Sequence, residues 1–358
     1  MAARRFPIFS FPPNVAERIL DYVPIAELFE ISLLSKRACS LVQNSSMLHR
    51  ENYEFDVELS ASSSVTAYRY RFHKTIEWHF FGKRDSRSQE IEDVETRTVK
   101  VSNGESDALV FAKLTENCYG HSSNSIQDVI QFVQYLSSLF GDITFRLNIE
   151  PVHFQHLEAI QSVEALRKSG QVYVTKGTVS HGEMVRIIEG FEPDLMSISC
   201  DPGSNFIYDR PICNRIFAIF TGSWFKGPML LNLHSEHVAV VNADVTEEDV
   251  IAFLIRQLEN RDGCGNMRTV EFFREPSNSD SVYDNRIKRA WDSEKITDAL
   301  SSCEQEVPET EEYNSRRLWR ENRTNFIDVV TRPERDPSFL TLLKDMNILE
   351  ANATIFSN

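Results

Sequence analysis

The segment from residue 6 to residue 45 carries more apolar surface than it can bury within itself, and this excess constrains the chain most. Prolines divide the segment into short helical stretches, because proline favours a helix start and pushes the preceding residue out of the helical region. Each stretch has apolar side chains on more than one face. A unit of about 40 residues rarely folds without staples or a partner, and no cysteine pair or metal site staples this one. The rest of the chain or another protein must therefore cover the excess.

The apolar spacing predicts three helices in this segment. The first carries Val15 and Ile19 and ends at Pro24, the second starts near Ala26, and the third runs over residues 36–42. The first two hold their apolar residues at the spacing of a helix that packs on a neighbour. The segment is therefore expected to be a small all-α module.

This segment resembles an F-box, whose usual pattern is Leu-Pro, an acidic residue, an Ile-Leu helix and a third helix rich in serine and arginine. Phe11-Pro12 stands for the Leu-Pro pair, Ile19-Leu20 for the helix pair, and Leu28 for the second-helix anchor. Residues 32–37 match the nematode variant of the pattern. Two positions depart from it: Phe11 replaces the usual leucine, and Asn14 replaces the acidic residue, which weakens one expected adaptor contact.

The F-box resemblance implies two partners, a Skp-family adaptor and, through it, a cullin. It also implies which side chains meet the adaptor. The adaptor-binding residues implied in this way are Phe11, Pro12, Val15, Ile19, Leu20, Val23, Leu28 and Leu33.

The rest of the chain alternates between strand-like and helix-like patterns. A two-residue apolar period predicts short strands at residues 55–59, 68–72, 76–80 and 110–114, with a charged loop from 83 to 95. Helices are then expected at residues 126–139 (ended by Gly141), 153–166, 182–191, 211–220 and 246–258. Strands between them are expected at residues 143–149, 172–174, 195–198, 229–233 and 267–273.

Strands that alternate with helices predict parallel pairing. The fold class is therefore α+β, with an all-α N-terminal module, then short strands, then a repeat-like α/β layer with mostly parallel strands. A curvature like that of a leucine-rich repeat is one form this layer can take, although no LxxLxLxxN string is present.

Residues 145–275 also resemble the nematode F-box-associated domain of the second type. The resemblance is carried by residues 230–233, 244–250 and 253–254, and residues 326–331 and 353–356 resemble its closing strands. Residues 332–350 depart from the short Asp-Gly turn of that family. The resemblance implies that this domain binds a target protein, whose identity stays open.

The expected domain organisation follows from these resemblances and from composition. It comprises an F-box at 6–48, a strand-rich connecting region at 54–120, an α/β domain at 121–300, an acidic linker at 301–318, and closing strands and tail at 319–358.

Net charge and cysteine usage limit which kinds of partner and which cellular compartment are expected. A net charge of -15 argues against nucleic acid, because nothing neutralises a run of phosphates. No stretch approaches the roughly 20 apolar residues of a membrane helix, so no membrane partner is expected. Six scattered cysteines without a CxxC pair are typical of reduced thiols. An intracellular location, in the cytoplasm, the nucleus or both, is expected.

The search for chemistry gives no catalytic residue, no metal site and no cofactor. His181 and Glu183 are two titratable groups at a helix start, and Cys264 lies on a glycine-flanked turn without a cation to activate it. Nucleotide, zinc and EF-hand motifs are missing from the sequence. Trp224 and Phe225 are candidate target-binding residues, because aromatic side chains are frequent at interfaces, although they are equally typical of a core.

Three functions stay open at this point. The first is a non-catalytic substrate receptor of a Skp–cullin–F-box ubiquitin ligase. The second is a scaffold that binds the adaptor without directing degradation, and the third is an enzyme in the α/β part.

Overall fold

The computed structural model of the chain divides into two compact units, residues 1–203 and residues 204–358. The structure describes residues 10–44, 53–60, 63–69, 73–82, 96–99, 109–114, 117–122, 125–141, 143–220, 222–241, 243–259, 269–273, 299, 314–319 and 326–331.

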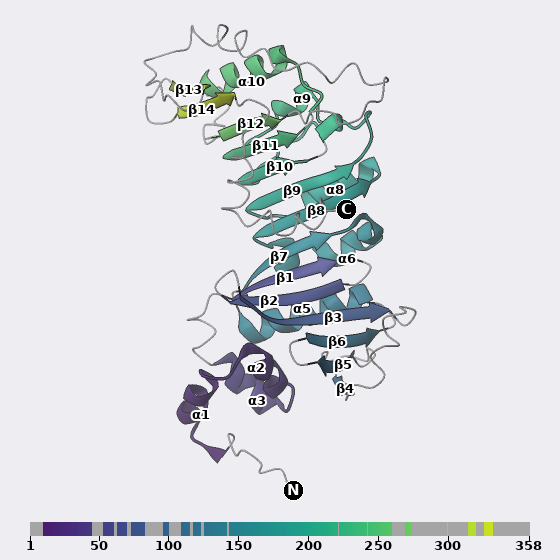
Figure 1. Ribbon diagram of the computed structural model, residues 1–358, viewed down its shortest axis with the longest axis vertical. Helices are drawn as coiled ribbons and strands as arrows, with labels where there is room; N and C mark the ends of the chain where they lie inside the picture. The colour runs from purple at the N-terminus through teal and green to yellow at the C-terminus, as the bar shows by residue number, and fades with distance from the viewer. Residues whose placement is uncertain are drawn as a thin grey trace. The chain divides into compact units, whose positions relative to one another are not determined.

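The first unit begins with three short helices, as predicted (Figure 1). They are α1 (Pro13–Leu20), α2 (Ile25–Ser32) and α3 (Lys36–Gln43). Pro13 occupies the first position of α1, and Pro24 precedes α2 with the extended backbone that a helix start requires. The Ser35 side chain caps α3 by accepting a hydrogen bond of 3.1 Å from the Ala38 amide.

A mixed sheet makes up most of the first unit, in the order β4-β5-β6-β3-β2-β1-β7-β8-β9. Strands β1, β2 and β3 form an antiparallel meander, and β1, β7, β8 and β9 pair in parallel. The strands are β1 (Tyr53–Leu59), β2 (Ser63–Arg69), β3 (His73–Gly82), β4 (Thr96–Val99), β5 (Leu109–Leu114), β6 (Asn117–Ser122), β7 (Thr144–Ile149), β8 (Gln171–Thr178) and β9 (Leu195–Asp201).

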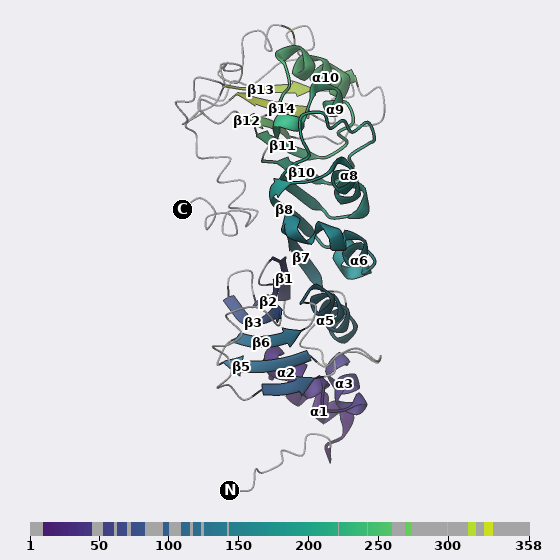
Figure 2. The same cartoon turned by 90° about the vertical axis from the view of Figure 1, so that its right-hand side faces the viewer.

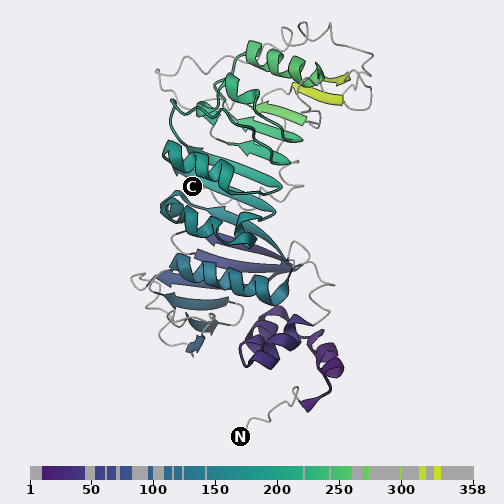
Figure 3. The same cartoon turned by 180° about the vertical axis from the view of Figure 1, so that it is seen from behind.

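Helices of the first unit lie on one face of this sheet, which Figures 2 and 3 show from the side and from behind. They are α5 (Ser125–Phe140), η3 (Pro151–His156), α6 (Leu157–Gln161), α7 (Glu164–Arg167) and α8 (His181–Gly190). The helix-facing residues of β1, such as Phe55 and Val57, are fully buried, and the alternate residues are not. The two-residue period of a strand thus separates an apolar, helix-covered face from a polar face.

The second unit contains a smaller sheet in the order β10-β11-β12-β14-β13. Its pairs are parallel except for β13 with β14. Its elements are β10 (Ile216–Ile219), η4 (Gly222–Trp224), α9 (Gly227–Leu230), β11 (His237–Val241), α10 (Glu247–Glu259), β12 (Thr269–Phe273), β13 (Asn314–Trp319) and β14 (Phe326–Thr331). Thr246 and Asp249 cap α10 reciprocally, as their spacing predicts.

Two predicted elements of the second unit are wrong. The helix expected at residues 211–220 is absent and residues 216–219 within this range form strand β10, while residues 229–233 begin in helix α9 rather than a strand. Both runs are short and apolar, so periodicity alone does not separate strand from helix. Pro228 in the first turn of α9 favours a helix start there, which explains why residues 229–233 begin in a helix. Strand β11 was not predicted.

Two predictions in the first unit need smaller corrections. The helix expected at 153–166 is divided into η3, α6 and α7, and β2 covers residues 63–69 rather than 68–72. The mostly parallel α/β region is confirmed. Its curvature stays a prediction, and the loop at 83–95 and the strand at 353–356 lie outside the described residues.

The compact units divide the chain differently from the expected domain ranges. The boundary after Gly203 falls inside the range 121–300, and β1 of the connecting region shares a sheet with β7 of that range. Strand β13 overlaps the end of the range 301–318, whose acidic run of residues 304–312 lies outside the described residues.

Gly141 provides a test of how α5 ends. Its φ of 70° lies in the left-handed region, so Gly141→Ala is expected to destabilise the first unit by about 1 kcal/mol. Gly182→Ala is the matched control, because a Cβ there meets open space at an ordinary φ and alanine favours a helix. Urea denaturation should show a lower midpoint for the first variant only. Equal midpoints would contradict the assignment of this helix end.

Candidate functional site

The N-terminal helices form a core of their own that uses part of their apolar surface. Ala16 and Leu20 of α1 are buried, as are Ile25 and Leu28 of α2 and Val42 of α3. Burial of these side chains stabilises the three-helix arrangement at roughly 1.5–3 kcal/mol for each large aliphatic group. These buried side chains occupy one face of each helix.

A second face of the module packs against the sheet through Phe29. The Phe29 ring makes edge-on contacts with Trp78 of β3 and with Phe132 and Tyr135 of α5, at centroid distances of 5.7, 5.2 and 5.9 Å. Trp78 and Phe132 also contact each other, at 5.1 Å. Rings in such arrangements contribute about 0.5–1.5 kcal/mol per pair beyond the area they bury. The α2 helix is therefore held on the sheet by an aromatic cluster.

Hydrogen bonds reinforce this junction. Ser32 donates to the Phe29 carbonyl oxygen at 2.5 Å, so its hydroxyl oxygen is left to accept from the Tyr135 hydroxyl, 2.8 Å away. Burial raises the pKa of Tyr135 to about 12, which keeps that hydroxyl protonated. Gln43 of α3 donates to the Ser138 carbonyl oxygen at 2.9 Å. Strand β3 and helix α5 thus cover part of the excess apolar surface of the N-terminal helices.

The remaining apolar surface of the module stays exposed. Tyr22 is 88% exposed and Leu34 is 68% exposed, while Phe11 and Val15 are 37% and 38% exposed. We call these four side chains the exposed apolar set. They lie before α1, on α1, directly after it, and between α2 and α3. Nothing in the described part of the chain buries them, so they are available to a partner.

The predicted adaptor-binding residues fall into three groups. Phe11, Pro12 and Val15 are exposed, and Ile19, Val23 and Leu33 are half-buried. Leu20 and Leu28 have no exposed surface and belong to the core of the module. Tyr22 and Leu34 were not among the predicted adaptor-binding residues, although their apolar side chains at helix ends were an available signal.

Trp224 and Phe225, the candidate target-binding residues, are both fully buried. Trp224 packs edge-on against Phe206 at 5.5 Å and against Phe225 at 5.9 Å. They are therefore core side chains of the second unit in this structure. An aromatic run followed by glycine is as typical of a core as of an interface, so the sequence alone did not separate the two. They present no surface to a target.

The titratable residues considered for catalysis have structural roles or lie outside the described residues. Glu183 forms the capping box of α8 with Ser180, and these hydrogen bonds hold its pKa below the usual value. Cys264 lies outside the described residues. Among the residues that the structure describes, no group of three or more His, Cys, Asp or Glu side chains is placed to hold a metal ion.

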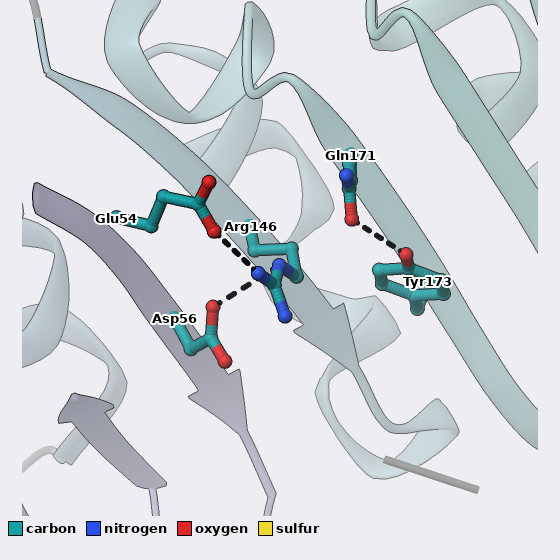
Figure 4. Close-up of polar contacts among 5 residues, drawn as sticks. All are labelled: Glu54, Asp56, Arg146, Gln171 and Tyr173. Atoms are coloured by element: carbon teal, nitrogen blue, oxygen red, sulfur yellow. Dashed lines mark hydrogen bonds and ion pairs between the residues drawn. The ribbon is translucent and has the colours of Figure 1, made fainter. Parts of the chain in front are cut away.

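A polar cluster lies on the face of the first unit's sheet opposite the helices (Figure 4). Arg146 of β7 forms ion pairs with Glu54 at 2.7 Å and with Asp56 at 3.3 Å, both on β1. On the next strand, Tyr173 donates a 2.6 Å hydrogen bond to Gln171. No motif in the sequence announced this cluster, because parallel pairing of β1 with β7 joins residues about ninety positions apart.

Burial dominates the electrostatics of this cluster. Desolvation raises the pKa of Asp56 to about 6, although the Arg146 guanidinium acts in the opposite direction. Partial desolvation, and then the Glu150 carboxylate, raise the pKa of Glu58. Desolvation also raises the pKa of Tyr68 to about 12 and that of Tyr173 further. At Asp56 the effect of desolvation thus exceeds the attraction of the Arg146 guanidinium.

Comparison with known proteins gives one match. Residues 8–50 match the F-box domain, which supports an F-box protein and suggests a role in binding a Skp-family adaptor. No curated protein and no solved structure shows a significant match to the chain. Among the described helices, none has the length and apolar character needed to span a membrane.

The Asp56 carboxyl predicts an unusual dependence of stability on pH. Its pKa is about 6 in the folded chain and about 3.9 when unfolded, so the folded state holds the extra proton between these values. Acidification from pH 7.5 to pH 5 carries the pH about one unit below the folded pKa, so it should raise this contribution to stability by roughly 1.4 kcal/mol. Asp56→Asn should be more stable than wild type at pH 7.5, with a smaller difference at pH 5.

Urea denaturation at both pH values measures this difference. Asp194→Asn makes the same chemical change at an exposed position in the first unit and should leave the wild-type pH dependence intact. A loss of stability in Asp56→Asn at pH 7.5 would show that the ion pair outweighs the burial of the charge.

Proposed function

We propose that this protein is a substrate-recognition subunit of a Skp–cullin–F-box ubiquitin ligase. The observation that carries the proposal is the exposed apolar set, which lies within or beside the matched F-box and remains after the aromatic junction has covered the face that carries Phe29. Exposed aromatic and aliphatic side chains are the usual anchors of a protein interface. The proposed partner at this surface is a Skp-family adaptor, which links the chain to a cullin.

The proposed contact uses Phe11, Pro12 and Val15 directly, with Ile19, Val23 and Leu33 at its half-buried edge. Leu20 and Leu28 support it from the core. Tyr22 and Leu34 are added to the surface because they are the most exposed of the module's large apolar groups.

The proposal assigns target binding to the domain that follows the F-box. The resemblance of residues 145–275 to the nematode F-box-associated domain of the second type supports this assignment. Ubiquitin transfer is left to other subunits, since a receptor acts by raising the local concentration of its target. The packing of Phe29 on β3 and α5 suits this role, because it fixes the sheet relative to the adaptor-binding helices.

The proposal also carries an intracellular location, in the cytoplasm, the nucleus or both. It is consistent with the free thiols of Cys39, Cys200 and Cys213 among the described residues.

Val15→Glu combined with Leu34→Glu tests the adaptor contact. Both side chains are exposed, so the variant should fold like wild type and yet bind a purified Skp-family adaptor at least about tenfold more weakly. Point variants are preferable to deletion of residues 6–45, which would uncover Phe132 and Trp78. Isothermal titration calorimetry measures the affinity.

Val152→Glu is the matched control, because Val152 is 59% exposed and lies on η3, outside the F-box. It should bind the adaptor like wild type. Unchanged adaptor affinity in Val15→Glu/Leu34→Glu, or equal loss in the control, would contradict the proposed contact.

A further inference from the structure

We propose that an apolar patch on the second unit is a docking surface for the target, and that it takes a segment that alternates aliphatic and acidic residues. The patch consists of four exposed side chains, Ile207, Pro211, Pro228 and Leu231. We call it the second-unit patch. The inference rests on the proposed function, and it names the place and the chemistry of target binding.

Buried aromatic side chains hold Ile207 at the surface. Phe206 and Tyr208, on either side of it in the chain, are 1% and 4% exposed, whereas Ile207 is 70% exposed. The Phe206 ring packs edge-on against the buried Trp224 at 5.5 Å. This alternation fixes the loop to the core of the second unit and leaves Ile207 outside. The aliphatic side chain therefore has a defined position at the surface.

Hydrogen bonds place this loop beside the end of α9. Asn232 Nδ2 donates to the Tyr208 carbonyl oxygen at 3.4 Å, and the Ile212 amide donates to the Asn232 carbonyl oxygen at 2.8 Å. Ile207 and Leu231 each lie one residue before a partner of the first of these bonds. The two side chains therefore belong to one region of the surface.

The other two members of the patch adjoin these side chains. Pro211 directly precedes Ile212 in the same loop. Pro228 and Leu231 are three residues apart in the first turn and at the end of α9, so they lie on the same side of the helix. Apolar side chains scattered singly over a surface are ordinary, whereas exposed apolar side chains gathered in one region indicate an interaction site.

Guanidinium groups flank the second-unit patch. Arg210 is exposed and lies within the loop of residues 207–212. Arg256 belongs to α10, which packs beside α9 (Figure 1), and its Nη1 donates a 3.0 Å hydrogen bond to the Leu231 carbonyl oxygen. The loop holds one carboxylate, that of Asp209, and α9 holds none.

This local charge determines the kind of segment that fits the patch. The chain as a whole has a net charge of -15, so a region with two guanidiniums and one carboxylate contrasts with the rest of it. Unlike charges attract strongly beside an apolar surface, because displaced water lowers the local dielectric. A segment whose aliphatic side chains cover Ile207 and Leu231, and whose carboxylates meet Arg210 and Arg256, matches both features.

Fluorescence anisotropy of the full chain in complex with a Skp-family adaptor tests the docking surface. The probe is a fluorescent peptide, acetyl-(Glu-Leu)4-amide. The adaptor covers the exposed apolar set of the F-box, so this set does not compete for the probe. Binding of the peptide does not come from diffuse attraction, because chain and peptide both carry net negative charge.

Two variants of the chain locate the binding. Ile207→Ser removes the most exposed aliphatic side chain of the patch and should raise the dissociation constant about tenfold. Arg210→Gln removes one guanidinium and should raise it about threefold. Both positions are exposed, so both variants should keep the wild-type midpoint of urea denaturation.

Val152→Ser and Arg186→Gln are the matched controls, because they make comparable changes at exposed positions of the first unit. Each should change the affinity less than about twofold. Equal weakening by control and test variants would overturn the inference, as would unchanged affinity in both test variants. Absence of wild-type binding at about 1 mM peptide would also overturn it.

Adaptor retention, measured in the same samples, reports on the proposed function separately. Absence of wild-type peptide binding while the adaptor stays bound overturns the docking surface alone. Failure of the wild-type chain to retain the adaptor overturns the proposed function, whatever the peptide does.

Discussion

The contact of Phe29 with the rings of Trp78, Phe132 and Tyr135 is the interaction on which the rest of the first unit depends. Three short helices with an excess of apolar surface do not form a stable unit alone. The aromatic cluster gives one of their faces a partner within the chain, and the hydrogen bond between Ser32 and Tyr135 fixes its orientation. The F-box helices therefore pack directly on the sheet and on α5 through this cluster.

This junction divides the apolar surface of the F-box into two parts with different roles. The face that carries Phe29 is satisfied by β3 and α5, and the exposed apolar set remains for an adaptor. The same sheet then continues into β1, β7 and β8, whose polar face carries Asp56 and Arg146. One hydrogen-bonded sheet thus joins the strand that holds the F-box helices to the parallel strands of the first unit, which suits a receptor that must hold its target in a fixed place.

Local signals in the sequence predicted much of this fold. Proline at helix starts, the apolar spacing of residues 36–42 and the glycine after α5 placed the start of α1, helix α3 and the end of α5 within one or two residues. Where the local signal was weak, as at β10 and α9, tertiary packing decided between strand and helix. The ion pairs of Arg146 with Glu54 and Asp56 were beyond prediction, because the register that aligns Asp56 with Arg146 depends on long-range strand pairing.

Hydrogen–deuterium exchange of the full chain, with and without a Skp-family adaptor, tests the division of the F-box surface most directly. The account predicts slower exchange in α1 and around Leu34 when the adaptor binds, with exchange in α5 and β3 unchanged. Faster exchange in α5 on adaptor binding would contradict it, since that result would mean that the adaptor displaces Phe29 from the aromatic cluster and takes the face that the sheet covers here.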